Sequence, residues 1–148
     1  MEIVTYVAAL RRKCQEVKDF KKLDELAETM FDALRNYNGL AAPAVAIAAN
    51  QLGYRGRMFV MSIPLRPPVC IVNPVITKQR GHQLGPEQCL SMPGKFVYVK
   101  RPRYITIKAV NQYGRFVKHK LSGFSARVAA HEIDHLDGKL IIDYEERG

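Results

Sequence analysis

Apolar side chains recur at helical spacing between residues 20 and 37. They fall three or four residues apart, and acidic or basic side chains occupy the opposite face. Asp19 is the expected N-cap, and Asn38-Gly39 is expected to end the helix. The pattern therefore predicts an amphipathic helix whose apolar stripe packs on a core.

The middle of the chain contains short apolar runs that prolines and glycines separate, which is typical of strands. We expect strands at residues 58–61, 69–76, 96–100, 104–110 and 115–121. The last two flank the sequence Asn-Gln-Tyr-Gly at residues 111–114, which favours a hairpin. A second helical pattern covers residues 125–136, and Gly138 is expected to end it.

This order of a helix, several antiparallel strands and a second helix predicts an α+β fold. The chain contains no repeat and no Ser/Gly-rich linker, and its 148 residues are enough for one hydrophobic core. We therefore expect residues 1–148 to form a single domain.

Composition places the chain among ordinary globular proteins, with 47% apolar and 25% charged residues. No apolar run approaches the roughly 18 residues of a membrane span. Glu2 stands where a signal peptide carries positive charge. The three cysteines, an odd number, are not typical of a disulfide framework. We therefore expect a soluble intracellular protein with no membrane partner.

The net charge of +9 is concentrated in the middle of the chain. Residues 33–131 carry fifteen basic groups and one acid, Glu87, whereas residues 132–148 carry two basic and six acidic groups. Such a cationic region suits RNA or another phosphate-rich surface, and it equally suits a face whose charge only keeps the protein soluble. Charge alone therefore indicates no particular function.

The strongest chemical signal is the sequence His131-Glu132-Ile133-Asp134-His135, the pattern H-E-x-x-H. On a helix, residues i and i+4 share a face, so both imidazoles can reach one metal ion. Glu132 projects about 100° away, which suits a general base that acts on a metal-bound water. The alternative interpretation is a pair of surface histidines on a charged helix.

A metal site of this kind needs at least a third ligand. The candidates elsewhere in the sequence are His82, His119, Cys70, Cys89, Asp143, Glu145 and Glu146. Cys70 lies in an apolar run and is interpreted as a buried hydrophobic residue, and His119 is expected to face solvent. Cys89 lies between prolines and beside Glu87, which makes it the best candidate. Three protein ligands leave a position for water, as in catalytic sites.

Three segments together resemble the motifs of the peptide deformylase family, which are G-φ-G-φ-A-A-x-Q, E-G-C-L-S and Q-H-E-x-D-H-L-x-G. Here they read A-V-A-I-A-A-N-Q over residues 44–51, E-Q-C-L-S over residues 87–91 and A-H-E-I-D-H-L-D-G over residues 130–138. Ala44 and Ala46 replace the two glycines of the first motif, Gln88 replaces a glycine and Ala130 replaces a glutamine. The chain resembles a short form of the family that lacks a C-terminal extension.

The resemblance implies a hydrolase that removes the N-formyl group from the formyl-methionine of nascent polypeptides and releases formate. It also implies antiparallel β-sheets around a central helix that carries H-E-x-x-H. Cys89, His131 and His135 would bind one divalent metal ion, Fe²⁺ in the native enzyme, and the same donors suit Zn²⁺, Ni²⁺ or Co²⁺.

The resemblance assigns three further residues to catalysis. Glu132 would take a proton from water and return it to the departing amine. The Gln51 amide and the Leu90 backbone N–H would donate to the tetrahedral intermediate.

The methionine side chain of the substrate is expected to enter an apolar pocket. The positions expected to bind substrate are Val45, Ala46, Glu87, Gln88 and Val128. Arg127 lies one helical turn before His131 and is expected to point to solvent. Glu87 is expected either to pair with a basic residue such as Arg101 or to receive a backbone N–H of the substrate.

Two other functions would use the same residues. A metallopeptidase would apply H-E-x-x-H chemistry to an internal amide, and a basic RNA-binding module with a structural metal would need a fourth ligand such as His82. We expect N-formyl-methionyl peptides as substrates, a monomer, and contact with the ribosome surface through the basic region. The expected location is the cytoplasm of a bacterium or of a phage-infected host, or an organellar matrix.

Overall fold

The computed structural model describes residues 7–36, 45–89 and 92–145. Its centre is one five-stranded antiparallel sheet in which the strands follow chain order. The strands are β1 (Ala46–Ala48), β2 (Met58–Met61), β3 (Val69–Cys89), β4 (Met92–Val110) and β5 (Phe116–Ser122). The helices are α1 (Val7–Leu10), α2 (Leu23–Asn36), α3 (Gly123–Leu136) and the 3₁₀ turns η1 (Ala49–Leu52) and η2 (Ile141–Tyr144). The predicted α+β fold is confirmed, and over these residues no helix is long and apolar enough to cross a membrane.

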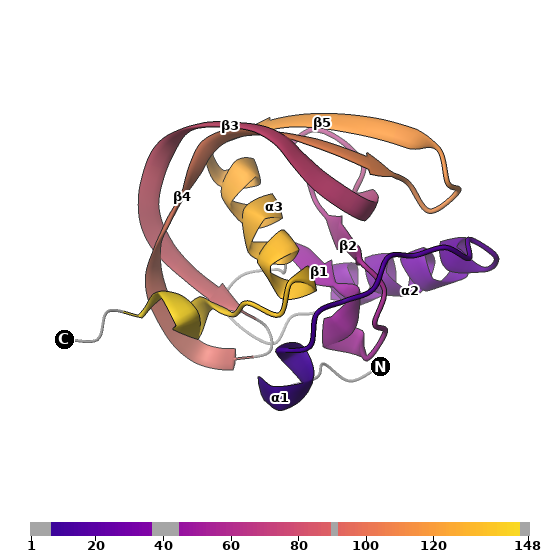
Figure 1. Cartoon of the computed structure of the whole chain (residues 1–148), viewed down its shortest axis with the longest axis horizontal. Coiled ribbons are helices and arrows are strands. Elements are labelled where there is room, and N and C mark those ends of the chain that lie inside the picture. The colour runs from indigo at the N-terminus through magenta and orange to yellow at the C-terminus, as the bar shows by residue number, and fades with distance from the viewer. Residues whose placement is uncertain (1–6, 37–44, 90–91, 146–148) are drawn as a thin grey trace.

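Strands β3 and β4 are much longer than predicted, and together they form a ribbon that curves around α3 (Figure 1). For the residues of β3 and β4 the sequence predicts three short strands, because prolines are expected to end strands. This prediction is wrong. Along β3, only the first four residues pair with β2. Along β4, only the last seven residues pair with β5. Beyond these pairings, one edge of β3 and one edge of β4 have no partner strand among the described residues. A proline such as Pro86 or Pro102 is tolerated in such a strand when its missing N–H falls on that edge.

The elements with strong local signals lie where they were expected. Both helices, the strand at residues 58–61 and the hairpin at residues 111–114 are confirmed. The N-cap prediction is wrong, because α2 begins after Lys22, which has a positive φ of 61°. Asp19 instead accepts a hydrogen bond from the Lys21 backbone N–H (2.9 Å) in the turn before the helix. The predicted end at Asn38-Gly39 lies outside the described residues.

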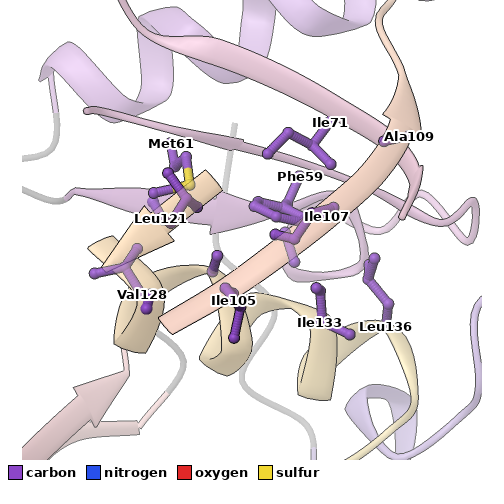
Figure 2. Packing of buried hydrophobic residues seen from close by; sticks show 14 of the residues in the cluster. Phe59, Met61, Ile71, Ile105, Ile107, Ala109, Leu121, Val128, Ile133 and Leu136 are labelled. Atoms are coloured by element: carbon purple, nitrogen blue, oxygen red, sulfur yellow. The ribbon is translucent and has the colours of Figure 1, made fainter. Parts of the chain in front are cut away.

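Two apolar clusters lie on opposite faces of the sheet. On one face, Phe59 and Ile107 pack against Ile133 and Leu136 of α3 (Figure 2). On the other face, alternate residues of β2 such as Met58 pack against α2. Because β2 is buried on both faces, its four residues are all apolar. The sheet therefore holds α3 on one side, and α3 carries the H-E-x-x-H sequence.

Gly138 ends α3 in a conformation that only glycine adopts easily. Its φ is 77°, and a Cβ at this position would stand 2.2 Å from the backbone oxygen of Arg11. We expect Gly138→Ala to lower the free energy of unfolding by about 2 kcal/mol, because a left-handed residue with a Cβ costs about 1–2 kcal/mol and the Arg11 backbone must also move. Urea unfolding measures the change. Gly94→Ala is the matched control, since Gly94 has a φ of 78° and open space around it, and equal losses in both variants would contradict the proposed clash.

Candidate active site

Helix α3 brings the two histidines of H-E-x-x-H together. His131 and His135 are 8% and 1% exposed, and their ring centroids are 5.0 Å apart. Their four-residue spacing on a helix places both rings on one face, as the sequence predicts. Burial lowers the pKa of His135 well below its ordinary value. His135 is therefore a neutral imidazole, which is the form that binds a metal ion.

Glu87 of β3 contacts the first of these histidines. Its Oε1 lies 2.9 Å from the Nδ1 of His131, and its side chain is 4% exposed. Burial acts to raise the pKa of Glu87, but hydrogen bonds from Arg101 and His131 outweigh it and lower the pKa to about 2. The carboxylate is therefore ionised, and it fixes the orientation of the His131 ring.

Two arginines donate to the same carboxylate. Arg101 of β4 donates to both Glu87 oxygens, from Nε (2.9 Å) and from a terminal nitrogen (2.8 Å). Arg127 of α3 donates to Glu87 Oε2 (2.8 Å). Protein donors thus occupy both oxygens of Glu87, which is the ion-pair role expected beside Arg101 and not the role of a receptor for substrate N–H groups.

The expectation that Arg127 points to solvent is wrong. Its side chain is 9% exposed, and besides Glu87 it donates to three backbone carbonyl groups of the β3–β4 ribbon. These are the carbonyl groups of Gln83, Gly85 and Val99. The reason is the curvature of the β3–β4 ribbon, which bends around α3 (Figure 1) and brings its carbonyl groups within reach of Arg127.

Arg101 extends the network to the C-terminal turn of the described chain. It forms an ion pair with Asp134 of α3, and the Tyr144 hydroxyl of η2 donates to the same Asp134 oxygen (2.6 Å). Burial opposes a charged Arg101, but Glu87 and Asp134 raise its pKa. The network therefore ties β3, β4, α3 and η2 together around His131.

Glu132 lies between the two histidines in the sequence and is 4% exposed. Within the described part of the chain, its Oε2 has no hydrogen-bond partner. Burial raises the pKa of Glu132 to about 7. Glu132 directly follows His131 on α3, and within the described residues no arginine donates to it as Arg101 and Arg127 donate to Glu87. A buried carboxyl group in this position suits a group that exchanges a proton with a reactant.

The η1 turn holds Gln51 beside α3. The Ala48 backbone N–H donates to Gln51 Oε1 (2.9 Å), and Gln51 is 1% exposed. With its oxygen engaged, the amide directs its NH₂ group the other way, as a donor. The neighbouring Asn50 donates from Nδ2 to the backbone oxygen of His135 (2.9 Å) and so fixes η1 against α3.

Comparison with known proteins identifies the family. The model of the family described as Polypeptide deformylase matches residues 1–147. The chain belongs to the peptide deformylase family. The peptide deformylase of Dictyoglomus thermophilum is 39% identical over 135 residues, which cover 90% of this chain and 84% of that protein. That of Thermotoga maritima is 38% identical over 136 residues, which cover 90% and 79%.

Solved deformylase structures share the fold. The structure of peptide deformylase from Thermus thermophilus has a TM-score of 0.90 and 35% identity, and the match covers 99% of this chain and 85% of that one. A probable peptide deformylase from a Synechococcus phage has a TM-score of 0.87 and 35% identity, with 97% and 99% covered. The predicted family and its hydrolase function are thereby confirmed, and removal of the N-formyl group from nascent polypeptides is the activity of this family.

The structure describes only the backbone of Cys89, the third expected metal ligand. Cys89 ends β3, but its side chain lies outside the described part of the chain, and Leu90 lies wholly outside it. Among the side chains that are described, no three His, Cys, Asp or Glu groups gather as a metal site. His131 and His135 are therefore the two predicted ligands whose geometry is known.

The other candidate ligands are engaged or placed differently. Burial raises the pKa of the Cys70 thiol to about 12, as expected for a buried hydrophobic residue. His119 is half-buried on the face of β5 that packs toward α3, so the expectation that it faces solvent is wrong. Asp143 and Glu145 form ion pairs with Arg11 and Lys95. His82 is exposed on β3, and Glu146 lies outside the described residues.

The donors that are described fit a divalent metal ion. Glu87 contacts the Nδ1 of His131, so a metal ion held by this residue would be bound through Nε2, and His135 is neutral. Deformylases are in general metal-dependent enzymes. The pair of imidazoles is therefore compatible with the metal that this family uses.

The predicted substrate-binding positions lie in different environments. Val45 is 38% exposed just before β1, Ala46 is buried opposite Met61, and Gln88 is exposed. Val128 is 8% exposed and packs in the core between α3 and the sheet (Figure 2). Their contact with substrate stays a prediction.

Sequence reasoning did not identify Asn50 and Tyr144 as parts of the site. Asn50 contacts a residue 85 positions away, and the pairing of Tyr144 with Asp134 depends on the course of the chain after α3. A local pattern of residue types carries no signal for either contact.

Proposed function

We propose that this chain is an active peptide deformylase that hydrolyses the formamide bond of N-formyl-methionyl peptides and releases formate. In this proposal residues 1–148 act as one catalytic domain and as a monomer, on nascent chains in the cytoplasm. The observation that carries the proposal is the burial of Glu132 on α3, directly after His131 in the chain, while Glu87 orients the His131 ring.

Cys89, His131 and His135 are the proposed ligands of one divalent metal ion, and Fe²⁺ is the proposed native ion. A bound metal ion of this kind supplies Lewis acidity and makes water a better nucleophile near neutral pH. A thiolate with two imidazoles also binds Zn²⁺, Ni²⁺ or Co²⁺. We propose that the protein binds any one of these ions through the same three ligands.

The remaining catalytic roles belong to the side chains and backbone of the chain itself. Glu132 accepts a proton from the attacking water on its carboxylate and passes it to the amine nitrogen as the C–N bond breaks. The Gln51 NH₂ group and the Leu90 backbone N–H donate to the oxygen that gains negative charge. The buried hydrogen bond from Ala48 N–H to Gln51 supports this role, because it fixes the amide before substrate arrives.

The methionine side chain is proposed to bind near Val45, Ala46 and Val128. Val45 is half-exposed and Ala46 lies at the start of β1, next to the segment that carries Gln51. Gln88, exposed beside Cys89 in the chain, is proposed to contact the peptide backbone of the substrate.

Formate release from formyl-Met-Ala-Ser tests the proposal, with protein that is prepared anaerobically with Fe²⁺. We expect turnover by the loaded protein, none after chelation, and recovery when Fe²⁺, Zn²⁺, Ni²⁺ or Co²⁺ is returned. Circular dichroism of the chelated protein is expected to stay that of a folded chain, since a catalytic ion is not needed for the core.

Three results would count against this function. A fully loaded protein that releases no formate is not a deformylase. Cleavage of an N-acetylated internal peptide in preference to the formylated one would indicate a metallopeptidase. Unfolding on metal removal would indicate a structural metal, as in a small metal-dependent binding module.

A further inference from the structure

The face of the sheet that points away from α3 is strongly basic. On β4 and β5, Ile105, Ile107 and Leu121 point to the core, so the residues that alternate with them point outward. The strand register aligns the outward residues in rows across β3, β4 and β5. These rows are Lys78–Thr106–Lys120, Arg80–Tyr104–Ser122 and the pair Lys108–Lys118.

These residues line one broad groove of about 1040 Å³. Five of its lining residues are cations, namely Lys78, Arg80, Lys108, Lys118 and Lys120, and none of the lining residues that the structure describes is acidic. Within the described part of the chain, none of the five takes part in an ion pair. The groove therefore presents uncompensated positive charge on a concave surface.

The arrangement of these cations costs stability in the absence of an anion. Lys108 and Lys118 stand directly opposite each other on neighbouring strands, and like charges in that position repel. A sheet face that serves only solubility is better served by charges of mixed sign. Bound phosphate groups would relieve the repulsion.

The groove also offers planar groups on which a nucleic acid base can stack. Tyr104 is 43% exposed at the centre of its row, and the Arg80 guanidinium lies 4.7 Å from the centre of the Tyr104 ring. Aromatic rings and guanidinium groups are the platforms on which proteins stack the bases of single-stranded RNA. A sheet surface with such a platform and flanking cations is a known form of RNA recognition.

We propose that this groove, lined by Lys78, Arg80, Tyr104, Lys108, Lys118 and Lys120, binds a single strand of RNA. The lysines hold backbone phosphates, and Tyr104 with Arg80 stacks a base. A membrane surface is a poorer partner because the charges lie in a concavity rather than on a flat or protruding face. The groove lies on the opposite side of the sheet from α3, so RNA bound there leaves the site of Glu132 open.

The test compares two triple variants that remove the same charge. The first is Lys108→Gln/Lys118→Gln/Lys120→Gln in the groove, and the control is Lys13→Gln/Lys18→Gln/Lys21→Gln on the exposed segment before α2. Binding of a fluorescent single-stranded RNA of mixed sequence is titrated at several salt concentrations. We expect the groove variant to bind at least about tenfold more weakly, with the slope of log K against log salt reduced by about 2, since each phosphate contact contributes about 0.7. The control is expected to change affinity less than twofold.

A single substitution separates base stacking from simple charge attraction. Tyr104→Leu keeps the charge of the groove, and we expect it to weaken RNA binding about tenfold while binding of inorganic polyphosphate stays unchanged. Formate release by every variant is measured as a check of folding, because none of these residues belongs to the catalytic site.

Three outcomes would overturn the proposal. The first is that the wild-type protein does not bind RNA at low salt. The second is that the two triple variants lose RNA affinity equally, which would make net charge the only cause. The third is groove-dependent binding to phosphatidylserine vesicles in a protein that does not bind RNA.

Discussion

Replacing Glu132 with glutamine is expected to lower formate release about 10²- to 10⁴-fold, which is the contribution that a positioned general base makes to catalysis. The substitution keeps the size of the side chain and one oxygen acceptor, and it removes the group that takes a proton. Because Glu132 is 4% exposed, bulk water cannot easily take over the role. The measurement is the turnover number with formyl-Met-Ala-Ser at saturating substrate, beside the metal content of each protein.

Two controls make this result specific. Glu28→Gln makes the same chemical change at an exposed position of α2 and is expected to leave turnover within twofold of the parent protein. Metal content is expected to be equal in all three proteins, because Glu132 is not a proposed ligand. If Glu132→Gln kept more than a tenth of the parent turnover at equal metal content, another group would have to be the base.

Local sequence patterns predicted the elements that are themselves local. The period of apolar residues predicted α2 and α3, and the hairpin at residues 111–114 follows from its turn residues. The length of β3 and β4 could not be read in this way. Whether a proline interrupts a strand depends on whether a third strand lies alongside, and that is a property of the whole sheet.

The same division applies to the site. The face shared by His131 and His135 follows from four-residue spacing on a helix, so the sequence predicted it. Contact between Glu87 and His131 joins residues 44 positions apart, and the sequence could only suggest that Glu87 has a basic partner. The buried position of Arg127 depends on the β3–β4 ribbon, whose carbonyl groups accept its hydrogen bonds. An arginine on a helix is ordinarily expected at the surface, so this residue was predicted wrongly.

The charges around His131 form a balanced set within the described chain. Glu87 and Asp134 supply two negative charges, and Arg101 and Arg127 supply two positive charges. Arg101 contacts both acids, whereas Arg127 has Glu87 as its ionic partner. Glu87 is therefore the member whose loss leaves a buried cation without a counter-charge.

Glu87→Gln is accordingly expected to lower the free energy of unfolding by about 3–5 kcal/mol, the usual cost of removing one partner from a buried ion pair. The amide of glutamine can still accept a hydrogen bond, but it cannot neutralise a guanidinium group that is 9% exposed. Urea unfolding at one fixed metal concentration measures the change. Glu16→Gln, an exposed acid before α2, is the matched control and is expected to change stability by less than about 0.5 kcal/mol.

A second substitution tests whether the uncompensated charge is the cause. Arg127→Met removes the cation that Glu87→Gln leaves unpaired and keeps an apolar side chain of similar length beside the ribbon. The double variant Glu87→Gln/Arg127→Met is therefore expected to lose about 1–3 kcal/mol less than the sum of the two single losses. If the losses simply add, the cost of Glu87→Gln comes from broken hydrogen bonds at each residue separately, and the ionic balance around His131 has no part in it.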